Sequence, residues 1–223
     1  MKIIATIHND FTTKFGIPRQ SGLVPEVESI IVFEPDYRNP EALRGLTDFT
    51  HLWLIWSFHL AERETWSPTV RPPILGGNTR VGVFATRSPF RPNPIGLSCV
   101  RLLGVEETKD YGPVIHVSGA DLMNGTPIYD IKPYIPYADC HPDAIGGFTE
   151  TAVKRTVSVM IPDPLLAQIP SEKLDALRAI LAQDPRPAYQ DDPDRVYGLT
   201  FGDLNLHFTV SDGILAVTDV TQL

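Results

Sequence analysis

The 223-residue chain contains little cysteine and no long apolar run. Its two cysteines, Cys99 and Cys140, are far apart and no His-x-x-x-His spacing accompanies them, which argues against a zinc site. The apolar run at 3–7 is too short for a signal sequence or a membrane span. We therefore expect a cytoplasmic protein with reduced, buried thiols, no metal and no membrane contact.

Three common enzyme signatures are absent as well. The segment GGNTRVG lacks the G-x-G-x-x-G spacing of a classical dinucleotide fold, and neither a P-loop nor a G-x-S-x-G elbow occurs. No nucleophile triad stands out. These absences exclude the most recognisable nucleotide-binding and hydrolase classes.

The net charge of −8 argues against broad, nonspecific binding to nucleic acid. The distribution of charge matters more than the sum. The stretch 65–101 contains no Asp or Glu, and its basic side chains are Arg71, Arg80, Arg87, Arg91 and Arg101. We expect one basic face on an otherwise acidic protein.

The first 140 residues have the pattern of a β domain. Twenty-one prolines favour extended segments and rigid turns, and nothing before residue 140 has the pattern of a long amphipathic helix. Asn39 and Pro40 predict a short helix that ends near Gly45. Strands are predicted at 2–8, 27–33, 51–60, 81–86, 97–108 and 113–122. The region 1–140 is therefore predicted to be an antiparallel β-barrel or strongly curved sheet.

The remainder, 141–223, has the pattern of a small α+β domain, with the boundary near Asp139–Asp143. A helix is predicted over 171–183, with Ser171 as N-cap and an apolar face that includes Leu177 and Ile180. Strands are predicted at 151–161, 196–201, 204–211 and 214–220, the last two joined by an Asp212-Gly213 turn. The fold class is thus mainly β with an α+β appendage.

Four segments carry polar residues that folding alone does not require: 14–22, 71–96, 121–134 and 182–189. Each has an ordinary interpretation, because loop arginines are usually solvated and Asn124-Gly125 suits a hairpin turn. His59 suits a satisfied interior histidine, and Trp53 and Trp56 suit the core. The density of such segments nevertheless favours a barrel that binds an anion or a cofactor.

The same segments resemble a known family. PRQSG, DFTHLWLIWSFH, RPPILGGNTRVGVFATRSPFRPNPIG, NGTPIYDIKPYIPYAD and AQDPRPAY are similar to the tRNA threonylcarbamoyladenosine methyltransferases, which are small β-barrel enzymes. The resemblance covers residues 1 to about 208 and departs at Asn124, where the family has an acid. It implies a dimeric, non-Rossmann enzyme that methylates N6 of threonylcarbamoyladenosine beside the anticodon of tRNA with S-adenosylmethionine.

The resemblance also implies the site residues. Those of the cofactor pocket are Pro18, Arg19, Gln20, His59, Leu60, Arg87, Leu97, Asp121 and Leu122. Arg19 or Arg87 suits the methionine carboxylate, and Asp121 suits the ammonium or a hydroxyl. His59 and Asp130 are candidates for a general base. Arg91, Lys132 and Tyr134 suit the phosphates and bases of the anticodon loop.

Two alternatives remain open. A noncatalytic RNA-binding module would use the same arginines for phosphates and would have no cofactor affinity. A methyltransferase that acts on another substrate would share the barrel, because a fold does not fix a substrate.

Overall fold

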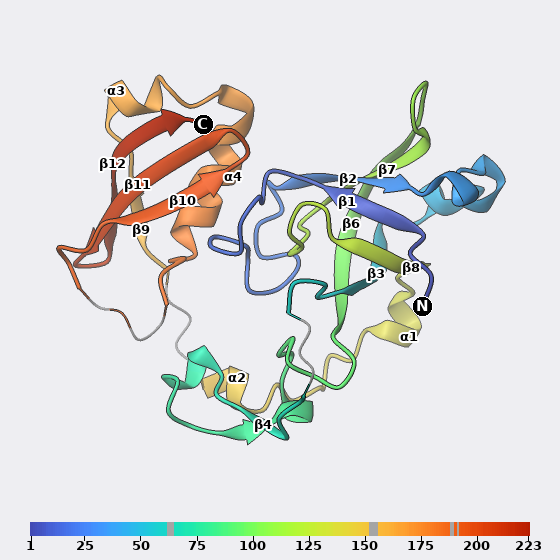
Figure 1. The fold of residues 1–223 in the computed structure, drawn as a ribbon, viewed down its shortest axis with the longest axis horizontal. Helices are drawn as coiled ribbons and strands as arrows, with labels where there is room; N and C mark the ends of the chain where they lie inside the picture. Colours follow the sequence, from blue (N-terminus) through green and yellow to red (C-terminus); the bar gives the residue numbers. More distant parts are fainter. Residues whose placement is uncertain (62–64, 152–155, 188–189, 191) are drawn as a thin grey trace.

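The computed structural model describes residues 1–223 except 62–64, 152–155, 188–189 and 191. Six antiparallel strands form a closed ring in the order β1-β2-β7-β6-β3-β8. The ring closes where Ala5 of β1 pairs with Ile128 of β8. The strands are β1 (Ala5–His8), β2 (Glu28–Phe33), β3 (His51–Ser57), β6 (Ile95–Thr108), β7 (Gly112–Ser118) and β8 (Pro127–Pro133). This barrel-like ring, on the right in Figure 1, confirms the predicted fold of the first 140 residues.

Alternation along the strands fills the ring with side chains. In β3, Leu52, Leu54 and Trp56 point inward and are buried, whereas Trp53 and Ile55 point outward and are half-buried. The prediction that 51–60 is a largely buried strand is therefore wrong for its outer face and for its end, because β3 stops at Ser57. The interpretation of Trp53 as a core residue is wrong for the same reason.

Between β3 and β6 the chain leaves the ring and forms a short hairpin of β4 (Thr69–Val70) and β5 (Val81–Gly82). Figure 1 shows this excursion below the ring. The predicted strand 81–86 is only two residues long, because the chain turns into a 3-10 helix at Val83–Ala85. The prolines that flank the hairpin favour such turns over a continuous strand.

The second unit is a four-stranded sheet in the order β10-β11-β12-β9, covered by the helix α4 (Ser171–Ala182). Leu177 and Ile180 of α4 are buried, as predicted. Ser171 is the first helical residue rather than the N-cap, which is Pro170. The other elements are α1 (Pro136–Asp139), α2 (Phe148–Thr151), β9 (Ser158–Met160), α3 (Asp163–Leu166), β10 (Tyr197–Phe201), β11 (Leu204–Ser211) and β12 (Ile214–Gln222).

Three local predictions have clear outcomes. Asp212 and Gly213 both have positive φ, 52° and 75°, which confirms the tight turn between β11 and β12. The predicted strand 151–161 is shortened to β9, because Thr151 ends α2, and 152–155 lie outside the described residues. The helix capped by Asn39 is a 3-10 helix over Pro40–Leu43, in which the Asn39 side chain accepts from the Glu41 amide.

The loop between β1 and β2 joins the two units. Phe11 packs against Phe201 of β10 with ring centroids 5.5 Å apart, and both belong to one hydrophobic core with α4. Gly16 in the same loop has φ +91°, and a Cβ there would lie 2.1 Å from the Leu199 side chain. Burying each large apolar side chain is worth roughly 1.5–3 kcal/mol. The C-terminal unit therefore fixes the loop that leads to Pro18 and Arg19.

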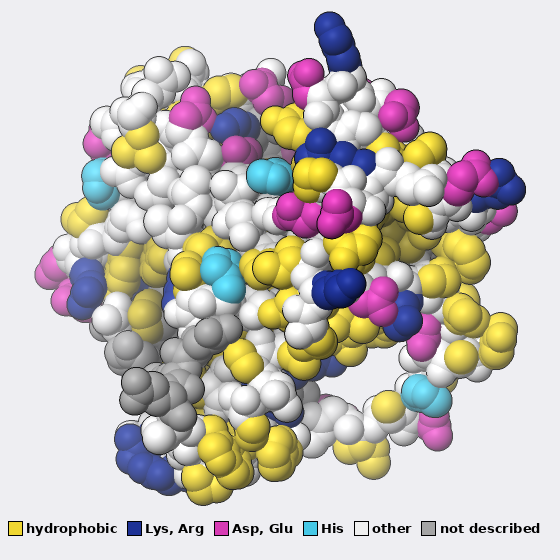
Figure 2. Space-filling view, turned by 45° about the vertical axis from the view of Figure 1, so that its right-hand side comes forward, with side chains coloured by type: hydrophobic (Ala, Val, Ile, Leu, Met, Phe, Trp, Pro, Cys, Tyr) yellow, Lys and Arg dark blue, Asp and Glu magenta, His cyan; other side chains and the backbone are white. Residues whose placement is uncertain are grey.

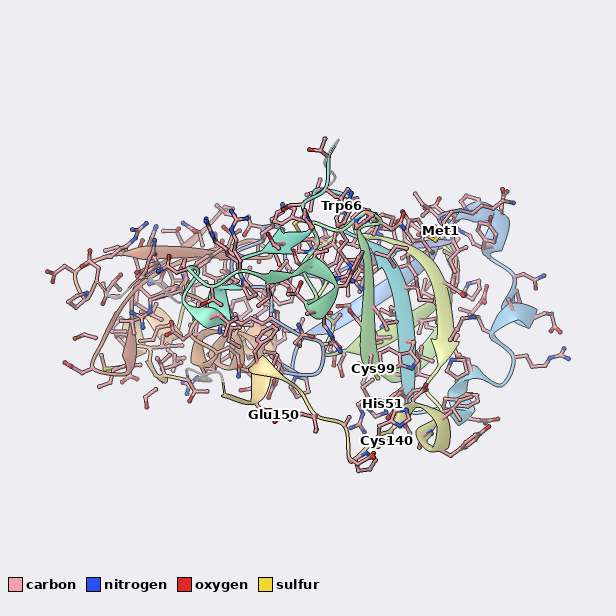
Figure 3. All side chains as sticks on the ribbon, turned by 90° about the horizontal axis from the view of Figure 1, so that it is seen from below. Met1, His51, Trp66, Cys99, Cys140 and Glu150 are labelled. Atoms are coloured by element: carbon pink, nitrogen blue, oxygen red, sulfur yellow. The ribbon has the colours of Figure 1, made fainter. Side chains whose placement is uncertain are left out.

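The two cysteines are free thiols. Cys99 is half-buried, whereas Cys140 is exposed, so the expectation of buried thiols is wrong for Cys140. Figure 3 shows both cysteines at the side of the molecule opposite Trp66. No helix within the described ranges has the length and hydrophobicity of a membrane span. No group of three or more potential metal ligands forms among the described side chains.

Candidate functional site

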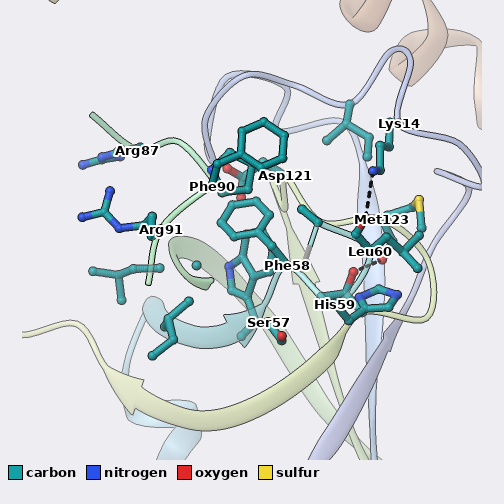
Figure 4. A pocket seen from close by; sticks show the side chains of 18 of the residues that line it. Lys14, Ser57, Phe58, His59, Leu60, Arg87, Phe90, Arg91, Asp121 and Met123 are labelled. Carbon is teal, nitrogen blue, oxygen red and sulfur yellow. Dashed lines mark hydrogen bonds between the residues drawn. The ribbon is translucent and has the colours of Figure 1, made fainter. Parts of the chain in front are cut away.

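A cavity of about 580 Å³ opens where β3 ends and β6 begins. Three of the four polar segments of the sequence contribute to its wall, together with the end of β3 (Figure 4). Eight of the nine predicted cofactor residues line it: Pro18, Arg19, Gln20, His59, Leu60, Arg87, Leu97 and Asp121. Segments that lie more than one hundred positions apart in the sequence thus meet at one site.

The acidic part of the wall is Asp121, held by a short chain of hydrogen bonds. The Trp56 indole donates to the Ser98 hydroxyl at 2.9 Å, and that hydroxyl donates to the Asp121 carboxylate at 2.5 Å. Burial raises the pKa of Asp121, and the Ser98 hydrogen bond and the Arg87 charge oppose that rise only in part. A carboxylate in this setting lacks a full solvation shell, so it favours a cationic or hydroxyl-bearing ligand.

The position of Trp56 depends on Gly96. The two residues face each other across β3 and β6, and a Cβ on Gly96 would lie 2.2 Å from the indole ring. Only glycine therefore lets the indole cross β6 and reach Ser98. Trp56 also packs against Phe58, with ring centroids 4.2 Å apart, and both rings line the cavity.

The cationic part of the wall comes from Lys14, Arg19, Arg87 and Arg91. Figure 4 shows Arg87 and Arg91 on one side of the cavity and Lys14 with His59 and Leu60 on the other. Lys14 donates to the Leu60 carbonyl at 3.3 Å. Cationic side chains thus flank the cavity on two sides, and each of them suits an anionic group of a ligand.

The fourth polar segment, 182–189, contacts a residue of the cavity wall without lining the cavity itself. Arg19 donates to the carbonyl of Asp184 at 3.4 Å, and Arg87 donates to the side-chain oxygen of Gln20. Asp184 is itself fixed by a buried ion pair with Arg186. Residues 188–189 of this segment lie outside the described residues. The DPRP sequence at 184–187 therefore does not line the cavity, but its Asp184 carbonyl holds Arg19, which does.

Four predicted site residues are not part of the cavity wall. Leu122 is fully buried in the ring core, and its carbonyl accepts from the Asn9 side chain. Asp130 and Lys132 form an ion pair with each other at 3.0 Å on β8, where their side chains are largely exposed. Tyr134 packs against Trp53, outside the cavity.

The predicted roles of Asp130, Lys132 and Tyr134 therefore find no support in the geometry of the cavity. The register explains this, because β8 runs away from the cavity: Ile128 pairs with Trp56 at the cavity end of β3, whereas Lys132 pairs with Trp53 farther along. Asn124, the departure from the family pattern, also has a structural role. Its side chain accepts from the Asn9 amide at 3.2 Å and closes the turn onto the end of β1.

The sequence analysis missed Lys14, Trp56 and Ser98. Trp56 was assigned only to the core, although it forms part of the wall and orients Asp121 through Ser98. The Trp56–Gly96 pair is a signal in principle, since glycine opposite a large ring indicates close packing. That signal is visible only after the register between β3 and β6 is known.

A second hollow, of about 380 Å³, adjoins the cavity. It shares Ala61, Phe90 and Arg91 with the cavity. The rest of its wall is formed by Thr65, Trp66, Ser67, Pro92 and Pro94. The site therefore has two adjacent compartments with Arg91 between them.

Both units match known family models. Residues 6–140 match the tRNA-methyltransferase O N-terminal domain, and residues 156–223 match the TrmO C-terminal domain. The chain belongs to the TrmO family. A tRNA (adenine(37)-N6)-methyltransferase of Escherichia coli (strain K12) is 40% identical over 218 residues, which cover 94% of this chain and 92% of that relative. The crystal structure of TrmO from P. aeruginosa superposes with a TM-score of 0.81 at 35% identity, covering 99% of this chain and 95% of that one.

A more distant relative bears on the cofactor. A protein of Pyrococcus abyssi, 35% identical over 152 residues, bears the name "Probable S-adenosyl-L-methionine-binding protein". The match covers 68% of this chain and 77% of that protein. These findings confirm the family resemblance seen in the sequence and identify the chain as a TrmO-type methyltransferase.

Proposed function

We propose that this TrmO-family chain transfers a methyl group from S-adenosylmethionine to N6 of adenine 37 in tRNA, and that this adenine carries a threonylcarbamoyl group. The observation that carries the proposal is the cavity itself. It joins one oriented carboxylate, Asp121, to cationic groups on two sides, in a chain whose E. coli relative is named a tRNA (adenine(37)-N6)-methyltransferase.

The cavity suits S-adenosylmethionine. Its volume of about 580 Å³ lies in the usual range for small-molecule sites. Arg19 or Arg87 would hold the methionine carboxylate, and Asp121 would accept from the ammonium or a ribose hydroxyl. Backbone groups near Leu60 and Leu97 would frame the adenine. The bound molecule supplies an activated methyl group, so the protein has to align the reactants and exclude water.

The charge of the wall points to an anionic acceptor. S-adenosylmethionine has a sulfonium, an ammonium and one carboxylate, so its net charge is positive. Among the residues that the structure describes, the cavity wall nevertheless presents three arginines and Lys14 against the single carboxylate of Asp121. An acceptor that brings its own carboxylate, as a threonylcarbamoyl group does, and RNA phosphates would balance this excess. A plain adenine would leave it unbalanced.

His59 is the better candidate for a general base. The urea-like acceptor nitrogen is a weak nucleophile, so removal of its proton would assist the transfer. His59 lines the cavity, whereas Asp130 does not and is paired with Lys132. We assign His59, and not Asp130, to this role.

The proposed function also implies a homodimer in the cytoplasm. The exposed apolar side chains Leu60, Ile95 and Leu97 line the cavity. A second copy of the chain would cover such side chains, in keeping with the dimer that the family resemblance implies. A tRNA substrate would be met in the cytoplasm.

The test compares two tRNAs that differ only in the threonylcarbamoyl group. Purified protein and S-adenosylmethionine are incubated with each, and the nucleosides are analysed by mass spectrometry. We expect methylation of the modified tRNA alone, and its loss in Arg87→Ala but not in the exposed control Arg44→Ala. Equal labelling of both tRNAs would refute the proposed acceptor. Binding of tRNA without any cofactor affinity would favour a noncatalytic RNA-binding module.

A further inference from the structure

Trp66 and Phe84 form an exposed aromatic pair beside the cavity. Their ring centroids lie 6.0 Å apart, and the residues are 50% and 70% exposed. Trp66 lines the second hollow, which shares Arg91 with the cavity. Large aromatic side chains in solvent contribute nothing to the core, so a close pair of them next to a site indicates a binding surface.

The backbone holds this pair in place. The amide of Val83 donates to the carbonyl of Pro68 at 2.9 Å, which joins the segment after β5 to the one before β4. Arg91 donates to the carbonyls of Val83 and Thr86 at 3.2 and 2.6 Å. Its guanidinium also lies over the Phe84 ring, 5.7 Å from the centroid. The rings are therefore presented in a fixed arrangement before any ligand arrives.

The charge around the pair selects the kind of ligand. The segment 65–101, which contains both rings, has no Asp or Glu, and Arg71 and Arg80 of its hairpin are exposed. Figure 2 shows hydrophobic side chains together with Lys or Arg side chains at the lower end of the molecule, where Figure 1 places β4. Aromatic faces combined with arginines are typical of surfaces that bind single-stranded nucleic acid.

We propose that Trp66 and Phe84 stack an unpaired base of the tRNA, that of the nucleotide next to the methylated adenine. The inference rests on the proposed function, because the hollow adjoins the proposed acceptor site. Arg91, which lines both compartments, would lie between the acceptor adenine and its stacked neighbour. The pair would thus supply affinity for a single-stranded loop without reading its sequence.

The test measures methylation kinetics of Trp66→Ala and Trp66→Phe. Loss of one stacked base corresponds to about a tenfold rise in the KM for tRNA. We expect this rise in Trp66→Ala, with kcat and the affinity for S-adenosylmethionine unchanged, and near-complete recovery in Trp66→Phe. The matched control is Tyr111→Ala, because Tyr111 is as exposed as Trp66, at 51% against 50%, and lines neither compartment of the site.

A second arm identifies the base. Anticodon stem-loops are prepared with an abasic site on either side of the acceptor adenine. One abasic substrate should raise the wild-type KM about as much as Trp66→Ala does, with no further rise when the two changes are combined. A Trp66→Ala enzyme with the KM of Tyr111→Ala, or fully additive effects, would overturn the stacking site. A wild-type enzyme inactive on tRNA would overturn the proposed function, and this inference with it.

Discussion

Asp184 and Arg186 form a buried, two-pronged ion pair, at 2.8 and 2.9 Å, directly behind the loop that carries Arg19. The carbonyl of the same Asp184 accepts from Arg19, so one residue links the C-terminal unit to the cavity wall. The pair therefore serves both the stability of the junction and the position of an arginine in the site.

The Asp184→Asn variant should lose stability and cofactor affinity together. The change removes one partner of the buried ion pair with Arg186, and breaking such a pair costs up to about 3–5 kcal/mol. We expect a lower free energy of unfolding in urea and weaker S-adenosylmethionine binding by calorimetry. The control Asp130→Asn, which breaks the largely exposed pair with Lys132, should change stability by less than about 1 kcal/mol. Equal losses in the two variants would contradict a special role for the buried pair.

The Asp121→Asn variant should bind S-adenosylmethionine about 10- to 100-fold more weakly, because a charge-assisted hydrogen bond is lost. The free energy of unfolding of this variant should instead be higher than that of the wild type. Burial raises the pKa of Asp121 above its ordinary value of 3.8, so the folded chain binds a proton that the unfolded chain has released. This group therefore reduces stability as the pH rises through the window above 3.8.

The free energy of unfolding, measured in urea across a range of pH, tests whether Asp121 lowers stability as the pH rises. The advantage of Asp121→Asn over the wild type should grow as the pH rises through that window and then level off. The control is Asp48→Asn, which removes an exposed carboxyl of a 3-10 turn that does not line the cavity. An advantage that shrinks with rising pH would mean that the pKa of Asp121 is lowered by its partners.

Lys173 should govern the acid stability of the junction. It contacts Asp10 at 3.3 Å and Asp203 at 2.7 Å. Burial disfavours its charge, but the hydrogen bond to Asp203 and the charge of Asp10 outweigh this and raise the pKa of Lys173, while the pKa of Asp203 is lowered. A lowered carboxyl pKa adds stability above pH 3.8 that is lost as the pH falls through the folded value. Lys173→Met should therefore flatten the fall in Tm on acidification, and Lys132→Met should not.

The sequence predicts most of the fold because the signals are local. Runs of β-branched residues predict β1 and β2, and the strand predicted at 113–122 overlaps β7. The apolar face of α4 and the Asp212-Gly213 turn also appear where expected. The failures have physical causes. The segment 81–86 looks like a strand, yet pairing is limited to Val81–Gly82 because the chain must return toward the ring through Thr86 and the following prolines.

The site was predicted less completely, because side-chain direction depends on register. Asp121 and Asp130 are both acids in one polar segment, but only Asp121 lines the cavity, since β8 carries Asp130 away from it. The role of Asp184 was equally hidden, because it acts through a backbone carbonyl. Contacts of this kind leave no trace in residue type, and the polar pattern alone therefore identifies the segments and not their individual contacts.

The register between β3 and β6 also explains why position 96 requires glycine, because it places Gly96 opposite Trp56. Gly96→Ala would place a methyl group 2.2 Å from the Trp56 indole, and overpacking of this kind costs about 1–3 kcal/mol. The displaced indole would no longer donate to Ser98, so Asp121 would lose its orientation and the affinity for S-adenosylmethionine would fall as well. Gly104→Ala is the matched control on the same strand, since nothing lies within 4 Å of its Cβ. Urea unfolding and calorimetry on the two variants separate the outcomes: a Gly96→Ala protein as stable and as tightly binding as Gly104→Ala would show that the Trp56–Ser98–Asp121 chain does not organise the site.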